Sequence, residues 1–201
     1  MLYSPERGVL ILEVPKTGTV ALSTGLRDVC QQVKELQRHV GANQARKHFG
    51  KDRWNELETV AVVREPISWL RSWYRYLNGK ERLGPDLSFH TFVERIAQGD
   101  SVDGNRINVR SQFYRLSDGR QQRVIVKHLL CFEHLGDEYA SLNSDLLGGQ
   151  GAPLQKANVS PRKKTEVTDE LQALIRDRWS QDFDIWRAAK GRANRKYQAA
   201  S

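Results

Sequence analysis

The sequence predicts a three-layer α/β domain, in which a central, mostly parallel β-sheet lies between layers of flanking helices. Three aliphatic runs of strand length support this fold class, at residues 8–14, 58–63 and 123–127. Each run is followed by a segment with apolar residues at helical spacing. Because strands and helices alternate along the chain, we expect neighbouring strands to pair in parallel through helical crossovers.

The first unit begins with residues 8–14, which are nearly all aliphatic, as in a parallel strand covered on both faces. The loop PKTGT then leads into a segment whose apolar residues recur at intervals of three and four positions. This spacing predicts an amphipathic helix over residues 19–38.

The second and third units repeat this order. Residues 58–63 form another β-branched run, Pro66 follows where the first turn of a helix tolerates proline, and a helical pattern covers 67–77. The third unit consists of a strand at 123–127 and a helix at 132–142.

The remaining segments are expected to surround these units. Residues 79–120 are rich in Gly, Asp, Asn and Arg and predict loops and short helices over the sheet edge, with one helix at 88–97. A flexible connector at 148–153 precedes a last helix from 169 to about 189. A chain of 201 residues can bury one sizeable core, so we expect a single domain over 1–201.

The composition limits the class of protein. No stretch approaches the ~18 apolar residues of a membrane span, and the first residues lack the basic start of a signal peptide. Cys30 and Cys131 lie too far apart for a disulfide framework or a metal motif, so we expect a cytoplasmic protein. The net charge of +8 and the isoelectric point near 9.7 favour an anionic partner, such as nucleic acid, an acidic polysaccharide or a phosphorylated ligand.

The loop PKTGT has the pattern of an anion site. A strand that ends in a glycine-containing turn and opens a helix directs backbone N–H groups and the positive helix end at one point. Lys16 stands just ahead of those amides, and Gly18 lets the backbone approach a ligand closely. The loop is not a complete nucleoside-triphosphate motif, because GxxxxGK[ST] requires the lysine after the second glycine. An ordinary strand-to-helix turn with an exposed lysine is the alternative.

A wider pattern includes this loop. VPKTGTVAL and AVVREPISWLRSWY resemble the two nucleotide-binding signatures of the sulfotransferases that use 3′-phosphoadenosine 5′-phosphosulfate (PAPS). The resemblance extends in the same order over nearly the whole chain and is similar to the carbohydrate sulfotransferase branch, which implies a P-loop-like fold. The further matching segments are HVGANQARKHFGKDRWN at 39–55, SFHTFV at 88–93, SQFY at 111–114, CFEHL at 131–135 and NVSPRKKTEVTDEL at 158–171.

The resemblance assigns residues to the two ends of the nucleotide. It implies that the second signature binds the 3′-phosphate through Arg64 and Ser72. Arg64 follows a strand, where ligands of open α/β sheets bind, and its planar fork suits a phosphate. The residues assigned to the 5′-phosphosulfate are Lys16, Thr17, Gly18 and Thr19, with the backbone amides of Val20 and Ala21. Those assigned to a basic loop near the adenine and the 3′-phosphate are Ser160, Arg162 and Lys163, although a solvated charge run explains that loop equally well.

The same resemblance implies a mechanism. In sulfuryl transfer an acceptor oxygen attacks in line and negative charge builds on the leaving phosphate, which Lys16 is placed to stabilise. His39 is the first candidate for the base, since related polysaccharide sulfotransferases carry an active-site histidine at this place. Glu13 is the second candidate, because it interrupts an aliphatic strand just before the loop. This reaction requires no metal, and no cluster in the sequence has metal-ligand spacing.

The acceptor is expected to be a hydroxyl compound, most simply a saccharide or a glycoside. The sulfotransferases of this branch that reside in the Golgi carry an amino-terminal membrane helix that is missing here, so the sequence resembles a minimal cytoplasmic version. A small-molecule kinase of related P-loop architecture is the alternative enzyme, but the Lys-Ser/Thr pair is missing. A nucleic-acid-binding module is a third class, for which no recognition motif is present. The sequence carries no signal for a particular oligomeric state.

Overall fold

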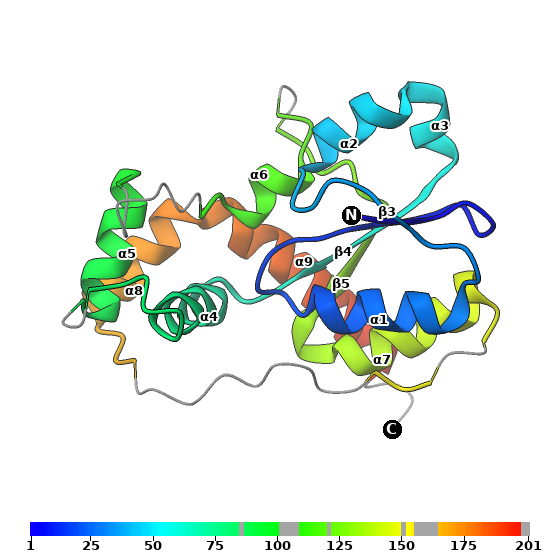
Figure 1. Cartoon of the computed structure of the whole chain (residues 1–201). Coiled ribbons are helices and arrows are strands. Elements are labelled where there is room, and N and C mark those ends of the chain that lie inside the picture. The colour runs from blue at the N-terminus through cyan, green and yellow to red at the C-terminus, as the bar shows by residue number, and fades with distance from the viewer. Residues whose placement is uncertain (85–86, 101–108, 120–121, 150–151, 155–164, 198–201) are drawn as a thin grey trace.

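The computed structural model describes residues 1–84, 87–100, 109–119, 122–149, 152–154 and 165–197. In these residues five strands form one sheet in the order β3-β1-β2-β4-β5 (Figure 1). The strands are β1 (Leu2–Ser4), β2 (Val9–Leu12), β3 (Lys34–Glu35), β4 (Glu58–Val63) and β5 (His128–Cys131).

Helices flank this sheet. They are α1 (Thr19–Val29), α2 (Ala42–Phe49), α3 (Lys51–Glu56), α4 (Pro66–Asn78), α5 (Phe89–Gln98), α6 (Gln112–Leu116), α7 (Leu135–Leu142), α8 (Asp169–Arg178) and α9 (Ser180–Tyr197). A 3-10 turn, η1 (Phe132–His134), precedes α7, and a π-helical turn, η2 (Asn143–Leu147), follows it. The α/β class is therefore confirmed.

The sheet is mixed, so the prediction of a mostly parallel sheet is not confirmed. β2, β4 and β5 are neighbours and run parallel, but β1 is antiparallel to both β2 and β3. Only residues 5–8 separate β1 from β2, and a connection this short can join two neighbouring strands only in antiparallel order. Two of the parallel strands, β2 and β4, lead at their carboxyl ends into residues predicted to bind the ligand, Lys16 and Arg64.

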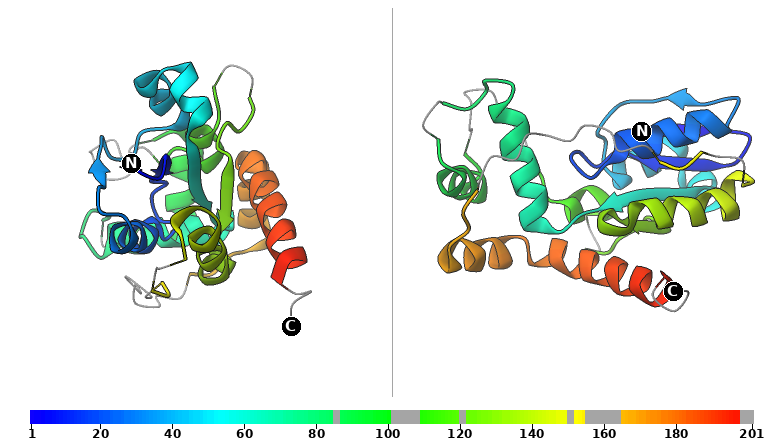
Figure 2. Two further views of the ribbon diagram at one scale, coloured as in Figure 1. Left: turned by 90° about the vertical axis from the view of Figure 1, so that its right-hand side faces the viewer. Right: turned by 90° about the horizontal axis from the view of Figure 1, so that it is seen from below.

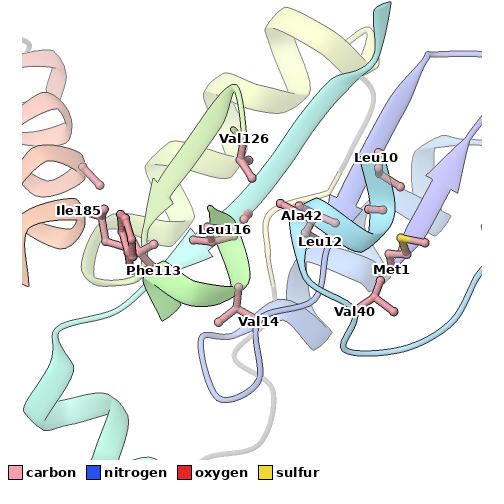
Figure 3. Close-up of a cluster of buried hydrophobic side chains, with 14 of the residues drawn as sticks. Met1, Leu10, Leu12, Val14, Val40, Ala42, Phe113, Leu116, Val126 and Ile185 are labelled. Atoms are coloured by element: carbon pink, nitrogen blue, oxygen red, sulfur yellow. The ribbon is translucent and has the colours of Figure 1, made fainter. Parts of the chain in front are cut away.

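Two hydrophobic clusters hold the helices on opposite faces of the sheet. On one face, alternate residues of β2 and β4 such as Ile11 and Val62 pack against α1 and α7. On the other face, Leu10 and Ala61 pack against α2, α3, α6 and α9. Figure 3 shows part of this second cluster, with Phe113 of α6 beside Ile185 of α9.

A third cluster lies beyond the sheet. α4, α5 and α8 gather at one end of the molecule, and α9 runs from them along the sheet (Figure 2). Trp69 and Phe92 are fully buried in this cluster, which also contains Trp179 and Phe183. The cluster therefore fixes α4, and with it the end of β4 from which α4 starts.

The third predicted strand is wrong in position. Residues 123–127 contain only an isolated bridge between Val124 and Ser117, and the third parallel strand, which pairs with β4, is β5 at 128–131. Val126 is buried in the core without belonging to the sheet ladder, so its apolar character predicted burial correctly but not strand pairing.

The first predicted helix is too long. α1 ends at Val29, because Cys30 is extended at φ −100° and ψ 128°, and the chain then forms β3. Val33 and Leu36 pack into the clusters on opposite faces of the sheet, so their spacing was mistaken for a helical period.

The other helical predictions agree more closely with the structure. The helices predicted at 67–77, 88–97 and 132–142 are confirmed to within a few residues. The last predicted helix is divided at Trp179 into α8 and α9. No helix in the described ranges combines the length and apolar character needed to cross a membrane.

Candidate functional site

The loop between β2 and α1 is closed by its own threonines. The hydroxyl groups of Thr17 and Thr19 each donate to the carbonyl oxygen of Val14 at 2.8 Å, and they lie 3.1 Å from each other. Both residues are buried. Their side chains therefore hold the loop in shape, and what they can present to a ligand is their backbone.

Gly18 is required at the turn for two reasons. Its φ is +80°, in the left-handed region that glycine adopts without strain. A Cβ atom at this position would also lie 3.0 Å from the side chains of Phe132 and Leu135. Lys16 is left-handed as well, with φ +69°, so the loop is a strained turn and not a simple extension of the strand.

The amino end of α1 is open. In the described part of the chain, no group accepts a hydrogen bond from the backbone amides of residues 17–20. The Ala21 amide donates to the carbonyl of Gly18 at 3.0 Å, so it takes part in the first helical turn and is not free for a ligand. Unpaired amides at the positive end of a helix of this length form an anion-binding arrangement.

Arg64, directly after β4, reaches this loop. Its guanidinium donates through Nη1 to the carbonyl of Lys16 at 3.2 Å and through Nε to the hydroxyl of Ser68 at 2.8 Å. The guanidinium carbon also lies 4.1 Å from the centre of the Phe132 ring. The structure therefore brings together Lys16 and Arg64, the two basic residues predicted for the two signatures.

Two positive charges meet at the site without a matching ion pair. Burial lowers the pKa of Lys16, and the charge of Arg64 lowers it further. Burial also lowers the pKa of Arg64, an effect that the nearby Glu133 opposes. The Lys16 ammonium lies 4.2 Å from the centre of the Tyr76 ring, and within the described ranges neither cation forms a salt bridge. A bound anion would relieve this repulsion.

Glu133 lies just beyond the carboxyl end of β5, the third of the parallel strands. Its carboxylate accepts from the Glu65 amide at 3.1 Å, the Trp186 indole at 3.0 Å and the Cys131 thiol at 3.1 Å. Burial, followed by the bond to Glu133, raises the pKa of Cys131 to about 12, so this thiol stays protonated. The sequence analysis missed Glu133, although its place just after a parallel strand was a signal for it.

Trp69 supports the loop from α4. It is fully buried, and its indole N–H donates to the carbonyl of Pro15 at 2.9 Å. It is therefore a core residue that anchors the loop and is not available for stacking against a sugar.

Ser72 is not in contact with Arg64. It lies half-buried one turn beyond Ser68 on α4, and the Ser68 hydroxyl is the one that accepts from the guanidinium. The assignment of both Arg64 and Ser72 to the 3′-phosphate stays a prediction, and the sequence analysis missed Ser68.

The two candidates for the base occupy different environments. The carboxylate of Glu13 is buried, lies 2.7 Å from the amino group of Met1 and is 3.7 Å from Arg38. His39 is exposed, and its Nδ1 lies 3.4 Å from the backbone carbonyl of Glu13. Arg115 holds the carbonyl of His39 at 2.7 Å. Both candidates are thus at the end of β2, but the Glu13 charge is already engaged while the His39 ring faces solvent.

The other predicted groups are not placed at the site. Ser160, Arg162 and Lys163 lie outside the described residues. Where the chain is described, no three His, Cys, Asp or Glu side chains are gathered as a metal site.

Two surface pockets formed by described residues are lined by neither Lys16 nor Arg64. The smaller, of about 240 Å³, is at the start of β5 and is lined by paired charges including Glu138 and Lys196. The larger, of about 750 Å³, lies beside α6 and is polar, with Arg110, Tyr114 and Arg178 in its wall.

We compared the chain with protein-family models, with curated protein sequences and with solved structures, and none of the three comparisons finds a match.

Proposed function

We propose that this chain is a PAPS-dependent sulfotransferase with a P-loop-like nucleotide site, which moves the sulfuryl group of PAPS to a hydroxyl of a saccharide or glycoside. The observation that carries the proposal is the contact between Arg64 and the loop carbonyl of Lys16. The contact joins the residues that the family resemblance assigns to the two phosphate ends of one nucleotide. A turn with an exposed lysine, the alternative interpretation, gives no reason for a second half-buried cation beside it.

The geometry supports two anion subsites. The amides of residues 17–20, for which the described residues offer no acceptor, and the Lys16 ammonium suit the 5′-phosphosulfate. The guanidinium of Arg64, set between α4 and Phe132, suits the 3′-phosphate. A ligand with phosphates at both ends of its ribose satisfies both subsites.

In the proposed reaction the acceptor oxygen forms a bond to sulfur as the bond between sulfur and the phosphate oxygen breaks. The electron pair of the broken bond stays on the 5′-phosphate of adenosine 3′,5′-bisphosphate, where Lys16 and the amides stabilise it. The proton of the acceptor hydroxyl goes to His39, whose ring is exposed at the end of β2. Glu13 is less suited to this role, because its carboxylate is buried against the Met1 amino group.

The reacting hydroxyl must lie beside Lys16 and His39, which do not line the larger pocket, so this pocket is a candidate only for a distant part of an extended acceptor. α6 separates this pocket from the nucleotide site. On one side of the helix Gln112 contacts Arg64 and Arg115 contacts His39. The pocket is lined by Ser111, Tyr114 and Ser117. Its volume of about 750 Å³ is in the range of small-molecule sites. Hydroxyl and guanidinium groups beside the exposed Tyr114 ring suit a polyhydroxylated ligand.

The test is a turnover assay with PAPS and a panel of saccharides and simple glycosides, following release of adenosine 3′,5′-bisphosphate. We expect acceptor-dependent release that Lys16→Ala abolishes and that Lys47→Ala, on the exposed face of α2, leaves unchanged. Phosphorylation of the same acceptors from ATP, with no turnover of PAPS, would contradict the proposal and favour a small-molecule kinase.

A further inference from the structure

A buried carboxylate on α9 holds the amino end of α6. Asp182 is fully buried, and its two carboxylate oxygens accept from the backbone amides of Gln112 at 2.9 Å and Phe113 at 2.8 Å. These are the first two residues of α6, whose amides have no partner within the helix. Asp182 therefore caps α6 from another helix, 70 positions away in sequence from Gln112.

The side chain of Gln112 continues this connection to Arg64. It is fully buried, its Oε1 accepts from the Arg64 amide at 2.9 Å, and its Nε2 donates to the Arg64 carbonyl at 2.9 Å. Two opposed bonds to one residue fix its backbone in the way that a neighbouring strand does. The position of Arg64 at the end of β4 is thus set by α6.

Arg64 in turn contacts the loop, since its guanidinium donates to the Lys16 carbonyl. An unbroken series of hydrogen bonds therefore runs from α9 through α6 and the end of β4 to the anion-binding loop. We infer that Asp182 and Gln112 are positioning residues, which hold the Arg64 guanidinium where it binds the 3′-phosphate. The ligand named in this inference rests on the proposed function, whereas the coupling of Arg64 to Asp182 does not.

The ionisation of Asp182 is expected to control the series. Burial raises the pKa of Asp182 to about 6, although the bonds from α6 oppose this rise. A protonated carboxyl group carries no charge and must direct its O–H to an acceptor, so both of its bonds from the α6 amides become weaker. In the described ranges no salt bridge to Asp182 shares this role, and Ser111 is a further hydrogen-bond partner of its carboxylate. The charged groups on elements packed against α9 include Glu58, Arg71, Arg75, Arg115, His128, Glu133 and Arg178.

The first test needs no ligand. ¹H–¹⁵N spectra recorded from pH 5 to 8 follow the Arg64 amide, which donates to Gln112, and the Arg64 Nε–H, which donates to Ser68. We expect both signals to shift with a common midpoint near pH 6, and we expect Asp182→Asn to abolish the shift. Arg64 signals that do not titrate, or that titrate equally in Asp182→Asn, would overturn the inference.

A second variant covers the case in which Asp182→Asn does not fold. Gln112→Met has a similar size but makes no bond to Arg64. In this variant the Phe113 amide, which donates directly to Asp182, should still titrate near pH 6, while the Arg64 amide should not. If the Arg64 amide still follows the Phe113 amide, the series does not run through Gln112 and the inference is wrong.

The ligand test compares two nucleotides. Gln112→Met should weaken the binding of adenosine 3′,5′-bisphosphate by about tenfold and that of adenosine 5′-phosphate by less than twofold, because only the former has a 3′-phosphate for Arg64. Gln98→Met, on the exposed end of α5, is the control and should change neither. Equal weakening of both nucleotides would indicate a purely structural role and contradict the inference. If the wild-type protein binds neither nucleotide, the proposed function fails, and the ligand-free spectra still decide the coupling.

Discussion

The guanidinium of Arg64 donates a hydrogen bond to the backbone carbonyl of Lys16 at 3.2 Å, across 48 positions of sequence. This contact lies at the carboxyl ends of two neighbouring parallel strands, β2 and β4. The contact brings the basic residue that follows β4, Arg64, to the basic residue that follows β2, Lys16. Both lie next to the open amino end of α1. Each prediction below depends on one part of this arrangement.

Lys16 should act on the chemical step. Lys16→Ala removes the ammonium from the leaving phosphate, and kcat should fall by about 100- to 1000-fold, as when a single oxyanion donor is removed. The thermal stability should change little, because the Lys16 side chain forms no salt bridge within the described residues. Steady-state kinetics with PAPS measure the effect, and a normal kcat with a raised KM would show that Lys16 only binds the nucleotide.

The charge of Lys16 predicts an alkaline limit to activity. Burial and Arg64 lower its pKa, so the ammonium loses its proton at a lower pH than an exposed lysine does. The charged form is the active one, so kcat/KM should fall as pH rises through this lowered pKa. Lys16→Arg stays charged in this range, so any activity that it retains should persist to higher pH. The same alkaline limb in Lys16→Arg would assign the titration to another group.

Arg64 should read the 3′-phosphate by its shape and its charge. Arg64→Lys keeps the charge but loses the planar fork, and the affinity for adenosine 3′,5′-bisphosphate should fall by about tenfold or more. The affinity for adenosine 5′-phosphate should change much less. Calorimetric titration measures both ligands, and an unchanged affinity for the bisphosphate would remove Arg64 from the site.

Substitution of Gly18 should lower the stability of the fold more than substitution of Gly99, which has nearly the same backbone conformation. Gly18 and Gly99 have φ of +80° and +81°, but only at Gly18 would a new Cβ press on Phe132 and Leu135; at Gly99 no described atom lies within 4 Å. Left-handed strain costs about 1–2 kcal/mol at either position, and overpacking adds about 1–3 kcal/mol at Gly18. Thermal unfolding should therefore show a larger loss for Gly18→Ala, and equal losses would mean that the loop can move away from η1 and α7.

The two candidate bases are separated by paired substitutions. His39→Gln should lower kcat by about 100-fold or more if its ring takes the acceptor proton. Glu13→Gln should leave kcat within a few fold of the wild type and act on stability, since it breaks the contact with the Met1 amino group. The opposite result in the two variants would assign the base to Glu13.

The local part of the fold could be predicted from sequence. Runs of β-branched residues followed by helical periods located β2, β4 and the helices α4, α5 and α7, because these elements depend on near neighbours. The errors came from contacts distant in sequence. β5 is defined by its ladder with β4, which the local sequence does not show. Val33 and Leu36 pack on opposite faces of the sheet, and their spacing alone cannot be distinguished from a helical period.

The site follows the same division. Lys16 and Gly18 were predicted from the loop that follows a strand, and Arg64 was predicted from the family resemblance, which its place after a strand supports. Asp182 and Gln112 were not, since nothing near either residue indicates that a helix cap and a glutamine side chain connect α9 to β4. Contacts of this kind depend on how elements pack, which the order of residues along one element does not specify.

The most direct measurement of the central claim is a thermal-shift titration with adenosine 3′,5′-bisphosphate beside ATP, ADP and AMP, on the wild type and Arg64→Ala. A ligand at 100 times its dissociation constant stabilises by about 2.7 kcal/mol, which corresponds to roughly 5–10 °C for a domain of this size. The account predicts this shift for the bisphosphate on the wild type and its loss in Arg64→Ala. A shift with ATP and none with the bisphosphate would contradict it.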